Sequence, residues 1–433
     1  MDRTAREVID GGAMGWRQWL IVAITVGLNA LDGFDVLSIS FASPGIARDW
    51  GVDQATLGWV LSMELIGMSI GSVLLGGVAD KIGRRPTIFL CLAAMTTGMW
   101  FSVHADGIPT LLAWRLLTGL GIGGMLAAIN AMAAEYSNGK WRNLAMSLMV
   151  IGYAIGGFLG GLVVQQLLAD GTWRDVFTFG AIATAAFFPL VWFLVPESVA
   201  FLERKRPHGA LAAINRTLGK LGHAPLAALA DVSAQQARQS LGDIFKPALI
   251  AATVLVTLAY FAHITSFYFI LKWVPKIVVD MGFAPGAAAG VLANANLGGA
   301  IGGAVFGLIA LRAGVRQLTM LAMVGSFGMI VWFGSGSSSI AQLSLMVAVT
   351  GLFTNSAIAG LYLLFARIYP THVRATGTGF AIGVGRGGAA LAPVLAGYLF
   401  QAGMGLQVVA VVMACGSLLG ALALWFLKEP PAD

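Results

Sequence analysis

The sequence of 433 residues contains little charge, since only 11% of it is Asp, Glu, Lys or Arg. A soluble domain carries about 25% charged residues, so this scarcity excludes an ordinary soluble enzyme. Cysteine is also scarce, and the two cysteines, Cys91 and Cys415, fall inside apolar runs. We therefore expect no disulfide framework. Metal-ligand spacings, nucleophile triads and phosphate-binding loops are missing, so the sequence predicts no enzyme, no metal site and no cofactor.

The sequence is instead rich in apolar residues, which make up 58% of it and gather in long runs. A transmembrane helix needs about 20 such residues. The charged start MDRTAREVIDGG lacks a signal-peptide cleavage pattern, so we expect the first run to remain as a span. The sequence predicts an all-α membrane protein that lies in the lipid bilayer with about twelve spans, at 17–42, 55–79, 86–104, 109–136, 143–168, 175–195, 247–275, 285–310, 316–335, 340–366, 375–400 and 405–427.

Positively charged residues gather on one side of these spans. Lys81, Arg84 and Arg85 follow the second span, and Lys140 and Arg142 follow the fourth, whereas the loops on the other side hold few cations. By the positive-inside rule, both termini of this multi-pass protein should be cytoplasmic. The rule also explains the net charge of +6, so we expect no nucleic-acid partner.

The longest connection between spans divides the chain. We predict a six-helix half over 1–196, a cytoplasmic linker over 197–246 and a second six-helix half over 247–433. The linker is basic and rich in alanine, and its 208–221 stretch has helical periodicity. It is either a solvated tether or a regulatory surface.

The two predicted halves carry similar loops. GGVADKIGRRP (76–86) follows span two, and GLIALRAGVRQ (307–317) follows span eight at the equivalent place. Internal repeats of this kind, with a binding site between the halves near the bilayer midplane, are typical of secondary transporters.

Three groups of residues resemble known family motifs. Gly76-x-x-x-Asp80-Lys81-x-Gly83-Arg84-Arg85 resembles the loop 2–3 signature of the major facilitator superfamily, and Arg115-x-x-x-Gly119-x-Gly121 resembles its span-four motif. DGFD (32–35), Glu135 and Arg386 together resemble the aromatic acid:proton symporter family, which includes benzoate, 4-hydroxybenzoate and protocatechuate transporters. The resemblance covers nearly the whole chain.

This resemblance implies a fold, an activity and a location. The expected fold is two six-helix halves around a central cavity. The expected activity is import of small aromatic carboxylic acids together with protons by alternating access, with the proton gradient as energy source. The expected setting is the inner membrane, with a monomeric functional unit and a role in the catabolism of aromatic compounds.

The chain departs from the family pattern at two positions. Leu311 stands in the second-half loop where the first half has Asp80, so an acid-dependent latch should operate in the first half only. Residue 272 is a lysine, whereas we do not expect a basic residue at this position throughout the family. This departure bears on the identity of the substrate.

Asp32 and Asp35 lie on one face of the first predicted span, three residues apart. Two neighbouring carboxylates in a low-dielectric setting do not both ionise cheaply. We therefore predict that one of them carries the coupled proton and that the pair faces a cavity rather than lipid. The alternative is a permanently charged pair that binds arginines and ties helices together.

Two arginines inside predicted spans are candidates for ligand and proton chemistry. Arg386 is flanked by glycines, and a guanidinium matches a carboxylate with two parallel hydrogen bonds. It either captures the substrate carboxylate or pairs with Asp32 or Asp35. Arg115 either tunes proton binding by an Asp of the first span or ties two spans together.

Other polar residues inside spans have less specific roles. Glu64 forms either a hydrogen bond to a neighbouring span or a proton relay. Lys272 snorkels to the outer interface or attracts an anionic substrate. His263 is expected to be a satisfied core residue rather than a proton carrier. Asn294, Asn296 and Asn355 bond to other helices or to a ligand hydroxyl.

Aromatic side chains are candidates for a planar slot around a ring-shaped ligand. Most aromatics in membrane proteins simply pack, so each candidate also has a packing interpretation. The predicted substrate-binding set is Arg386, Phe34, Tyr153, Phe267, Tyr362, Asn294 and Lys272.

A separate group of residues lies at the predicted cytoplasmic surface. The resemblance implies a gate in which Asp80 pairs with a cation or helix N-terminus of the other half. The alternative is that the positive charges serve only to set the membrane topology, which explains the cations of this group but not Asp80. The predicted gate comprises Gly76, Asp80, Gly83, Arg84, Arg85, Glu135 and Arg142.

Three glycine strings, GLGIGG (119–124), GGFLGG (156–161) and GGAIGG (298–303), are predicted to let helices pack closely rather than to bind nucleotides.

Three other activities compete with import of aromatic acids. They are symport of non-aromatic organic anions such as sugar acids or dicarboxylates, drug–proton antiport, and reception without transport. The cations Arg115, Arg386 and Lys272 argue against a cavity for cationic drugs.

Overall fold

The computed structural model describes residues 4–229, 241–247, 249–370 and 373–427. Over these residues it is all helical, and twelve helices are long and apolar enough to cross a membrane. The predicted spans are thereby confirmed. They are α2 (Trp16–Trp50), α3 (Gln54–Ile82), α4 (Arg84–Val103), α5 (Ile108–Tyr136), α6 (Arg142–Asp170), α7 (Trp173–Leu194), α10 (Ile250–Asp280), α11 (Pro285–Ile309), α12 (Val315–Gly334), α13 (Ile340–Ile368), α14 (Arg374–Gln401) and α15 (Leu406–Trp425).

Two of these helices extend well past the predicted ends. Helix α2 continues through Pro44 to Trp50 and stops at Gly51, whose φ of 60° is left-handed. Helix α10 continues through Pro275 to Asp280. Proline is tolerated in membrane helices because neighbouring helices and local adjustments satisfy the freed backbone groups.

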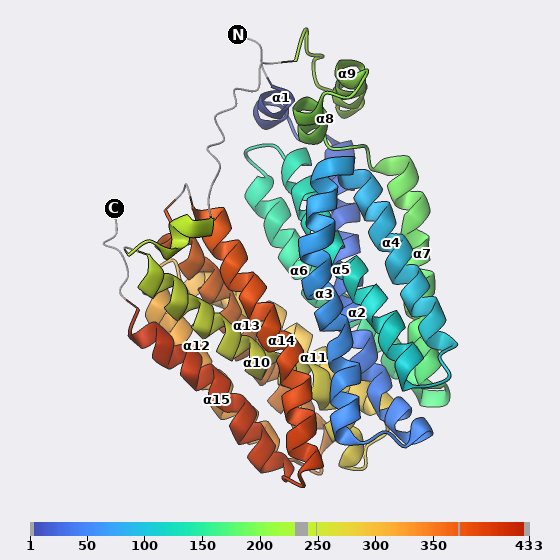
Figure 1. The fold of residues 1–433 in the computed structure, drawn as a ribbon, viewed down its shortest axis with the longest axis vertical. Coiled ribbons are helices and arrows are strands. Elements are labelled where there is room, and N and C mark those ends of the chain that lie inside the picture. The colour runs from blue at the N-terminus through green and yellow to red at the C-terminus, as the bar shows by residue number, and fades with distance from the viewer. Residues whose placement is uncertain (1–3, 230–240, 248, 371–372, 428–433) are drawn as a thin grey trace.

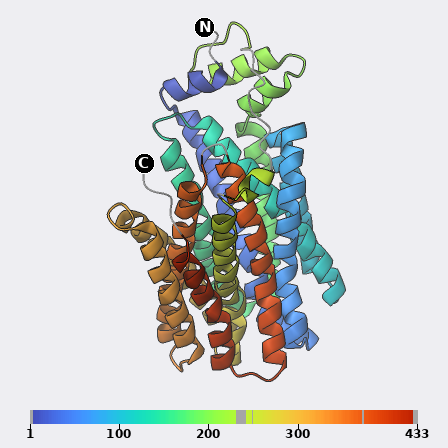
Figure 2. The ribbon, with the colours of Figure 1, turned by 60° about the vertical axis from the view of Figure 1, so that its left-hand side comes forward.

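Three short helices form a layer across one end of the molecule (Figures 1 and 2). They are α1 (Ala5–Gly11), α8 (Val199–Lys205) and α9 (Ala210–Leu221), and we name this the linker end. Helix α9 matches the periodicity predicted at 208–221, whereas α1 and α8 were not predicted. A 3-10 helix, Leu241–Phe245, precedes α10, and residues 230–240 of the predicted linker lie outside the described residues.

The layer at the linker end is attached to the six helices α2–α7, which we name the first half. Arg17 at the start of α2 donates to the carbonyl of Lys220 at 2.7 Å. Asn138, after α5, donates to the carbonyl of Gly12 at 2.9 Å. Arg6 of α1 donates at 2.8 Å to the carbonyls of Ala134 and Glu135.

The first half meets the second half, α10–α15, mainly where α3 packs on α14 and α6 packs on α11. The Ser62 hydroxyl donates to the Ala390 carbonyl at 2.6 Å. A Cβ on Gly58 would lie 2.6 Å from the Pro393 carbonyl oxygen, and one on Gly286 would lie 2.6 Å from that of Gln165. These contacts lie toward the end opposite α1, α8 and α9, which we name the closed end (Figure 1).

The glycine strings lie at helix–helix contacts, as predicted. A Cβ on Gly156 would overlap the carbonyl oxygen of Ala30 on α2, and one on Gly298 would overlap that of Ala348 on α13. A Cβ on Gly123 would similarly overlap the Met68 carbonyl on α3. Small residues bring the helix backbones together where lipid supplies no hydrophobic drive for association.

Replacing Gly156 with Ala is expected to lower the apparent unfolding temperature in detergent. The new methyl group requires α2 and α6 to move apart, and overpacking of this kind costs about 1–3 kcal/mol. Gly303→Ala is the matched control, since a Cβ there meets nothing within 4 Å. That variant should be neutral or slightly stabilised, because Ala is favoured over Gly inside a helix. Equal behaviour of the two variants would contradict the packing role.

Candidate functional site

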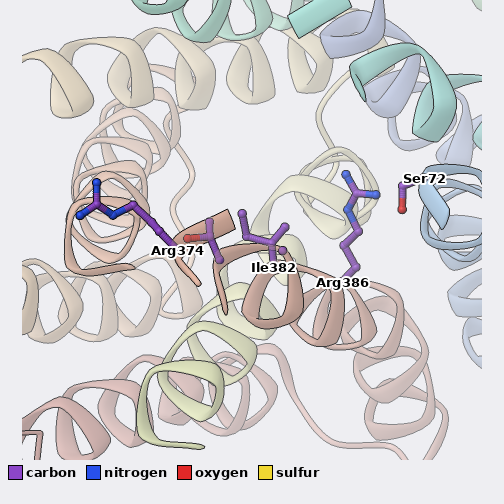
Figure 3. A pocket seen from close by; sticks show the side chains of 7 residues that line it. Ser72, Arg374, Ile382 and Arg386 are labelled. Carbon is purple, nitrogen blue, oxygen red and sulfur yellow. The ribbon is translucent and has the colours of Figure 1, made fainter. Parts of the chain in front are cut away.

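A cavity of about 640 Å³ lies between α14 and α3. Its lining residues are Ser72, Arg374, Thr378, Gly379, Ile382, Gly383 and Arg386. Arg374 is the first residue of α14, at the linker end, and Arg386 lies near the middle of the helix. In Figure 3 the Arg386 side chain reaches from α14 toward Ser72 on α3. The cavity therefore extends from the linker end to mid-helix depth between the two halves.

Arg386 is available to an anion in this cavity. Its guanidinium donates one hydrogen bond, to the carbonyl of Met68 at 3.3 Å, and forms no ion pair with any acid among the described residues. It is not paired with Asp32 or Asp35, which was the alternative considered from the sequence. The flanking glycines permit close packing of α14 on α10, since a Cβ on Gly385 would overlap the Tyr260 ring.

Two tyrosines of α10, Tyr260 and Tyr268, interact electrostatically with Arg386. Tyr260 of α10 and Tyr362 of α13 share a hydroxyl–hydroxyl contact of 3.2 Å. Tyr268 of α10 interacts electrostatically with Arg386 and with Tyr153 of α6. Phe267 packs edge-on against Tyr268, with ring centroids 5.2 Å apart. The predicted residues Tyr153, Phe267 and Tyr362 are thus gathered in one region, together with Tyr260 and Tyr268.

Two other predicted binding residues point elsewhere. Phe34 packs edge-on against Phe179 of α7 at a centroid separation of 5.2 Å, inside the first half. Asn294 donates to the carbonyl of Gly290 in its own helix at 3.1 Å. Asn296 and Asn355 likewise donate within their own helices, at 3.3 Å and 3.0 Å. Of the predicted binding set, Arg386 lines the cavity, whereas its other members do not, namely Phe34, Tyr153, Phe267, Lys272, Asn294 and Tyr362.

Asp32 and Asp35 are buried inside the first half. Their residues are 1% and 0% exposed, so the expectation that they face a cavity is wrong for this conformation. The carboxyl oxygens of both form no hydrogen bond with a described residue, and the nearby Thr184 hydroxyl donates to Gly180 instead. Gly33, between them, allows close approach of α6, since a Cβ there would overlap the Tyr153 carbonyl oxygen.

The surroundings of the two aspartates differ. Asp35 lies in the field of Glu64 and Arg115. Asp32 interacts with Asp35 as its only charged neighbour among the described groups, and it lies near Cys91 of α4 and Tyr153 of α6. The arrangement therefore leaves Asp32 without a compensating cation.

A buried charge cluster joins three helices. Arg115 of α5 pairs with Glu64 of α3 at 3.0 Å, and Lys272 of α10 lies 4.0 Å from the same carboxylate. All three side chains are 0% exposed. Lys272 also donates to the carbonyl of Val36 on α2. The snorkelling interpretation of Lys272 is wrong, because its ammonium has ionic and carbonyl partners inside the protein.

His263 is a satisfied core residue, as expected. Its two ring nitrogens lie 3.0 Å from the Ser417 hydroxyl and 3.0 Å from the Thr354 carbonyl.

Besides its ion pair with Glu64, Arg115 contacts the Met99 sulfur at 3.2 Å and lies over the Phe177 ring at 5.0 Å from its centroid.

The predicted gate residues form a network at the linker end. Asp80 pairs with Arg84 at 2.9 Å and with Arg204 of α8 at 2.9 Å. The partner expected in the second half is therefore replaced here by α8, a helix that the sequence did not predict. Gly83 has a φ of 111°, which favours glycine, and it separates α3 from α4. Gly76 has open space around it.

Glu135 and Arg142 belong to the same region. Arg84 lies 3.7 Å from Glu135, whose carboxylate also accepts a hydrogen bond from the Ser198 hydroxyl. Arg142 pairs with Asp10 of α1, and Arg6 pairs with the same carboxylate at 3.2 Å. Arg6 also donates to the Glu135 carbonyl at 2.8 Å, so the two groups are connected.

Sequence reasoning missed several members of this network. Glu197 accepts hydrogen bonds from the backbone of Arg84, at 2.9 Å, and of Arg85, at 3.3 Å. It therefore caps the start of α4, where backbone N–H groups lack helical partners. Glu197 lies in the short sequence PES, which follows the sixth predicted span and was the available signal for this cap. Neither this sequence nor Asp10 belongs to one of the family motifs.

The sequence model described as the Major Facilitator Superfamily matches residues 25–330 and 274–433. The gallate transporter of Pseudomonas putida is 28% identical over 97% of this chain and 94% of its own length. The 4-hydroxybenzoate transporter PcaK of Pseudomonas aeruginosa is 30% identical over 86% of this chain and 84% of its own.

A solved structure supports the same assignment of fold. The crystal structure of a D-xylose-proton symporter superposes with a TM-score of 0.73 at 17% identity, covering 95% of this chain and 98% of the other. At that identity the likeness concerns the fold alone. With twelve apolar helices and family matches over nearly its whole length, the chain is a multi-pass membrane protein that belongs to the Major Facilitator Superfamily.

Proposed function

We propose that this transporter imports small aromatic carboxylic acids together with protons by alternating access. Membership of the superfamily makes the chain a transporter rather than an enzyme. Its relatives are named as transporters of gallate and of 4-hydroxybenzoate, both of which are aromatic carboxylates. The substrate class, the proton and the direction of transport are our inferences from these relatives and from the site.

The observation that carries the substrate class is the position of Arg386. A guanidinium without an acidic partner, lining a cavity between the halves, offers a carboxylate two parallel hydrogen bonds. Tyr260 and Tyr268 interact electrostatically with Arg386, and the Tyr362 hydroxyl contacts that of Tyr260. Aromatic rings pack favourably on an aromatic ligand in stacked or edge-on geometry.

The proton is assigned to the aspartate pair on α2, and to Asp32 in particular. A buried carboxylate without a cation or hydrogen-bond donor is costly, so it favours the protonated form. Asp35, by contrast, has a cation nearby, Arg115, together with the opposing carboxylate of Glu64. In this proposal Asp32 holds a proton in the conformation described here and exchanges it when the first half opens to water.

The proposal also places the protein in a membrane. The linker end carries the basic residues of the loop 2–3 motif, so we assign it to the cytoplasm, with both termini on that side of the inner membrane. The cavity at Arg374 and Arg386 then opens toward the cytoplasm, and the closed end faces outward. The structure thus corresponds to an inward-facing step of transport.

Uptake into proteoliposomes tests the proposal. Labelled 4-hydroxybenzoate is offered with and without an inward proton gradient, in competition with gallate, benzoate, gluconate or succinate. We expect accumulation that depends on the gradient and is reduced by the aromatic acids only. Competition by gluconate or succinate would indicate a transporter of non-aromatic organic anions. Accumulation that is independent of the gradient would contradict proton coupling.

A further inference from the structure

The charge cluster of Glu64, Arg115 and Lys272 is distributed unequally between the halves. Glu64 and Arg115 both belong to the first half, so their pair at 3.0 Å lies within one half. Lys272 belongs to the second half, and its partners, the Glu64 carboxylate and the Val36 carbonyl, belong to the first. Both of these polar contacts of the Lys272 ammonium therefore cross the interface.

The position of Lys272 places this contact at the region where the halves meet. Lys272 lies far along α10 from its linker-end start, next to Trp273, whose indole donates to the Pro393 carbonyl on α14 at 3.2 Å. Pro393 in turn packs against Gly58 of α3. The ammonium is thus part of the packed closed end and not of the cavity lining.

We propose that Lys272 and Glu64 are positioning residues of the transport cycle, whose ionic contact holds the outer ends of the two halves together. When the outer ends separate, Lys272 loses its partners and is exposed to entering water, while Glu64 keeps Arg115. Separation therefore costs the loss of this ionic contact in addition to the packing of α3 on α14 and of α6 on α11. A buried charge that loses its partner is costly until water or a new partner replaces it.

The charges of the cluster support this assignment. Glu64 has two cationic neighbours, Arg115 and Lys272, and the Asp35 carboxyl lies in the field of the same cluster. Withdrawal of Lys272 removes one of these two cations from beside the DGFD pair. The contact therefore links opening of the outer end to the electrostatic environment of the proposed proton site. It rests on alternating access in the proposed function, and not on the identity of the substrate.

A distance measurement between spin labels tests the proposal without substrate. Arg48 near the end of α2 and Met404 between α14 and α15 are exposed residues at the closed end, one in each half, and are replaced by labelled cysteines. Cys91 and Cys415 are replaced by Ala in this background. Lys272→Met should raise the population with longer distances about fivefold or more, the lower end of coupling between sites in proteins.

Lys276→Met is the matched control, because Lys276 pairs with Asp280 one turn further along the same helix, within one half. It should leave the distribution unchanged, and Lys272→Arg should restore the wild-type distribution. Should Lys272→Met fail to fold, Glu64→Gln combined with Lys272→Met removes one charge of each sign and should show the same shift. An unchanged distribution in these variants, or an equal shift in Lys276→Met, would overturn the proposal. An absence of aromatic acid uptake would not affect this readout.

Discussion

Asp32→Asn is expected to abolish accumulation driven by the proton gradient while leaving exchange of substrate across the membrane. Asn keeps the shape of a protonated Asp but cannot release the proton, so the variant is held permanently in the proton-loaded form. With one proton per carboxylate anion, a gradient of one pH unit supports about tenfold accumulation in the wild type, since one unit corresponds to about 1.4 kcal/mol. The variant should reach a ratio of about one, because without a titrating group nothing couples the gradient to substrate.

Two measurements on the same proteoliposomes separate this effect from loss of folding. Gradient-driven uptake should be lost, whereas counterflow of labelled substrate into vesicles preloaded with unlabelled substrate should persist. Asp49→Asn is the matched control, because Asp49 lies near the exposed end of the same helix and accepts from the Trp173 indole at 2.9 Å, which an Asn oxygen also does. Wild-type accumulation by Asp32→Asn would exclude it as the coupling residue.

Asp35→Asn should behave differently from Asp32→Asn. Asp35 lies in the field of Arg115, next to the buried pair with Glu64. Its replacement removes a carboxyl from beside this pair, and disturbing the partners of buried charges destabilises proteins strongly. Both gradient-driven uptake and counterflow should therefore fall, together with the apparent unfolding temperature.

Arg386→Lys is expected to raise KM for aromatic carboxylates by roughly 10–100-fold, since hydrogen bonds to charged groups contribute about 1.5–3 kcal/mol. Lys keeps the positive charge but loses the planar fork that binds both carboxylate oxygens. Arg386→Gln removes the charge as well and should lose measurable transport. Initial rates of uptake over a range of substrate concentrations give KM and the maximal rate separately.

The control for Arg386 is the other arginine of the cavity. Arg374 donates to the Tyr369 carbonyl at 3.2 Å and lies at the linker end, more than three turns away along α14. Arg374→Lys keeps its charge and should change KM less than about fivefold, the scale of an exposed ionic contact. An unchanged KM in Arg386→Lys would remove the two-bond interaction with the substrate carboxylate.

The spans were predictable because the bilayer sets their length and apolarity. The predictions failed where contacts between residues far apart in the sequence decide where a helix ends or which residues pair. A span ending near residue 42 was a reasonable prediction, since Pro44 removes a backbone donor. The helix continues because the surrounding helices bury the turn that contains the proline, with Phe41, Pro44 and Ile46 all buried. That packing has no signature in the local sequence.

The candidate site was predictable where one residue type has few alternatives. Arg386, flanked by glycines in mid-span, was predicted to capture a carboxylate or to pair with Asp32 or Asp35, and it lines the cavity without that pairing. The partners of charged residues were not predictable. Glu64 and Lys272 are separated by more than two hundred residues, and their contact depends on how α3 and α10 approach each other. Motif resemblance likewise placed Asp80 in a gate but did not reveal Arg204 as its partner.

The layer of α1, α8 and α9 has a consequence for imaging this protein. Small transporters show little mass outside a detergent micelle, which makes particle alignment in cryo-electron microscopy difficult. A synthetic antibody fragment bound to this layer would serve as a rigid fiducial mark. It would be rigid because Arg6, Arg17 and Asn138 connect the layer to the first half. Particles aligned on that fragment would show the first half at a fixed position. Displacement of the second half during transport would then be directly visible as blurring or as separate classes.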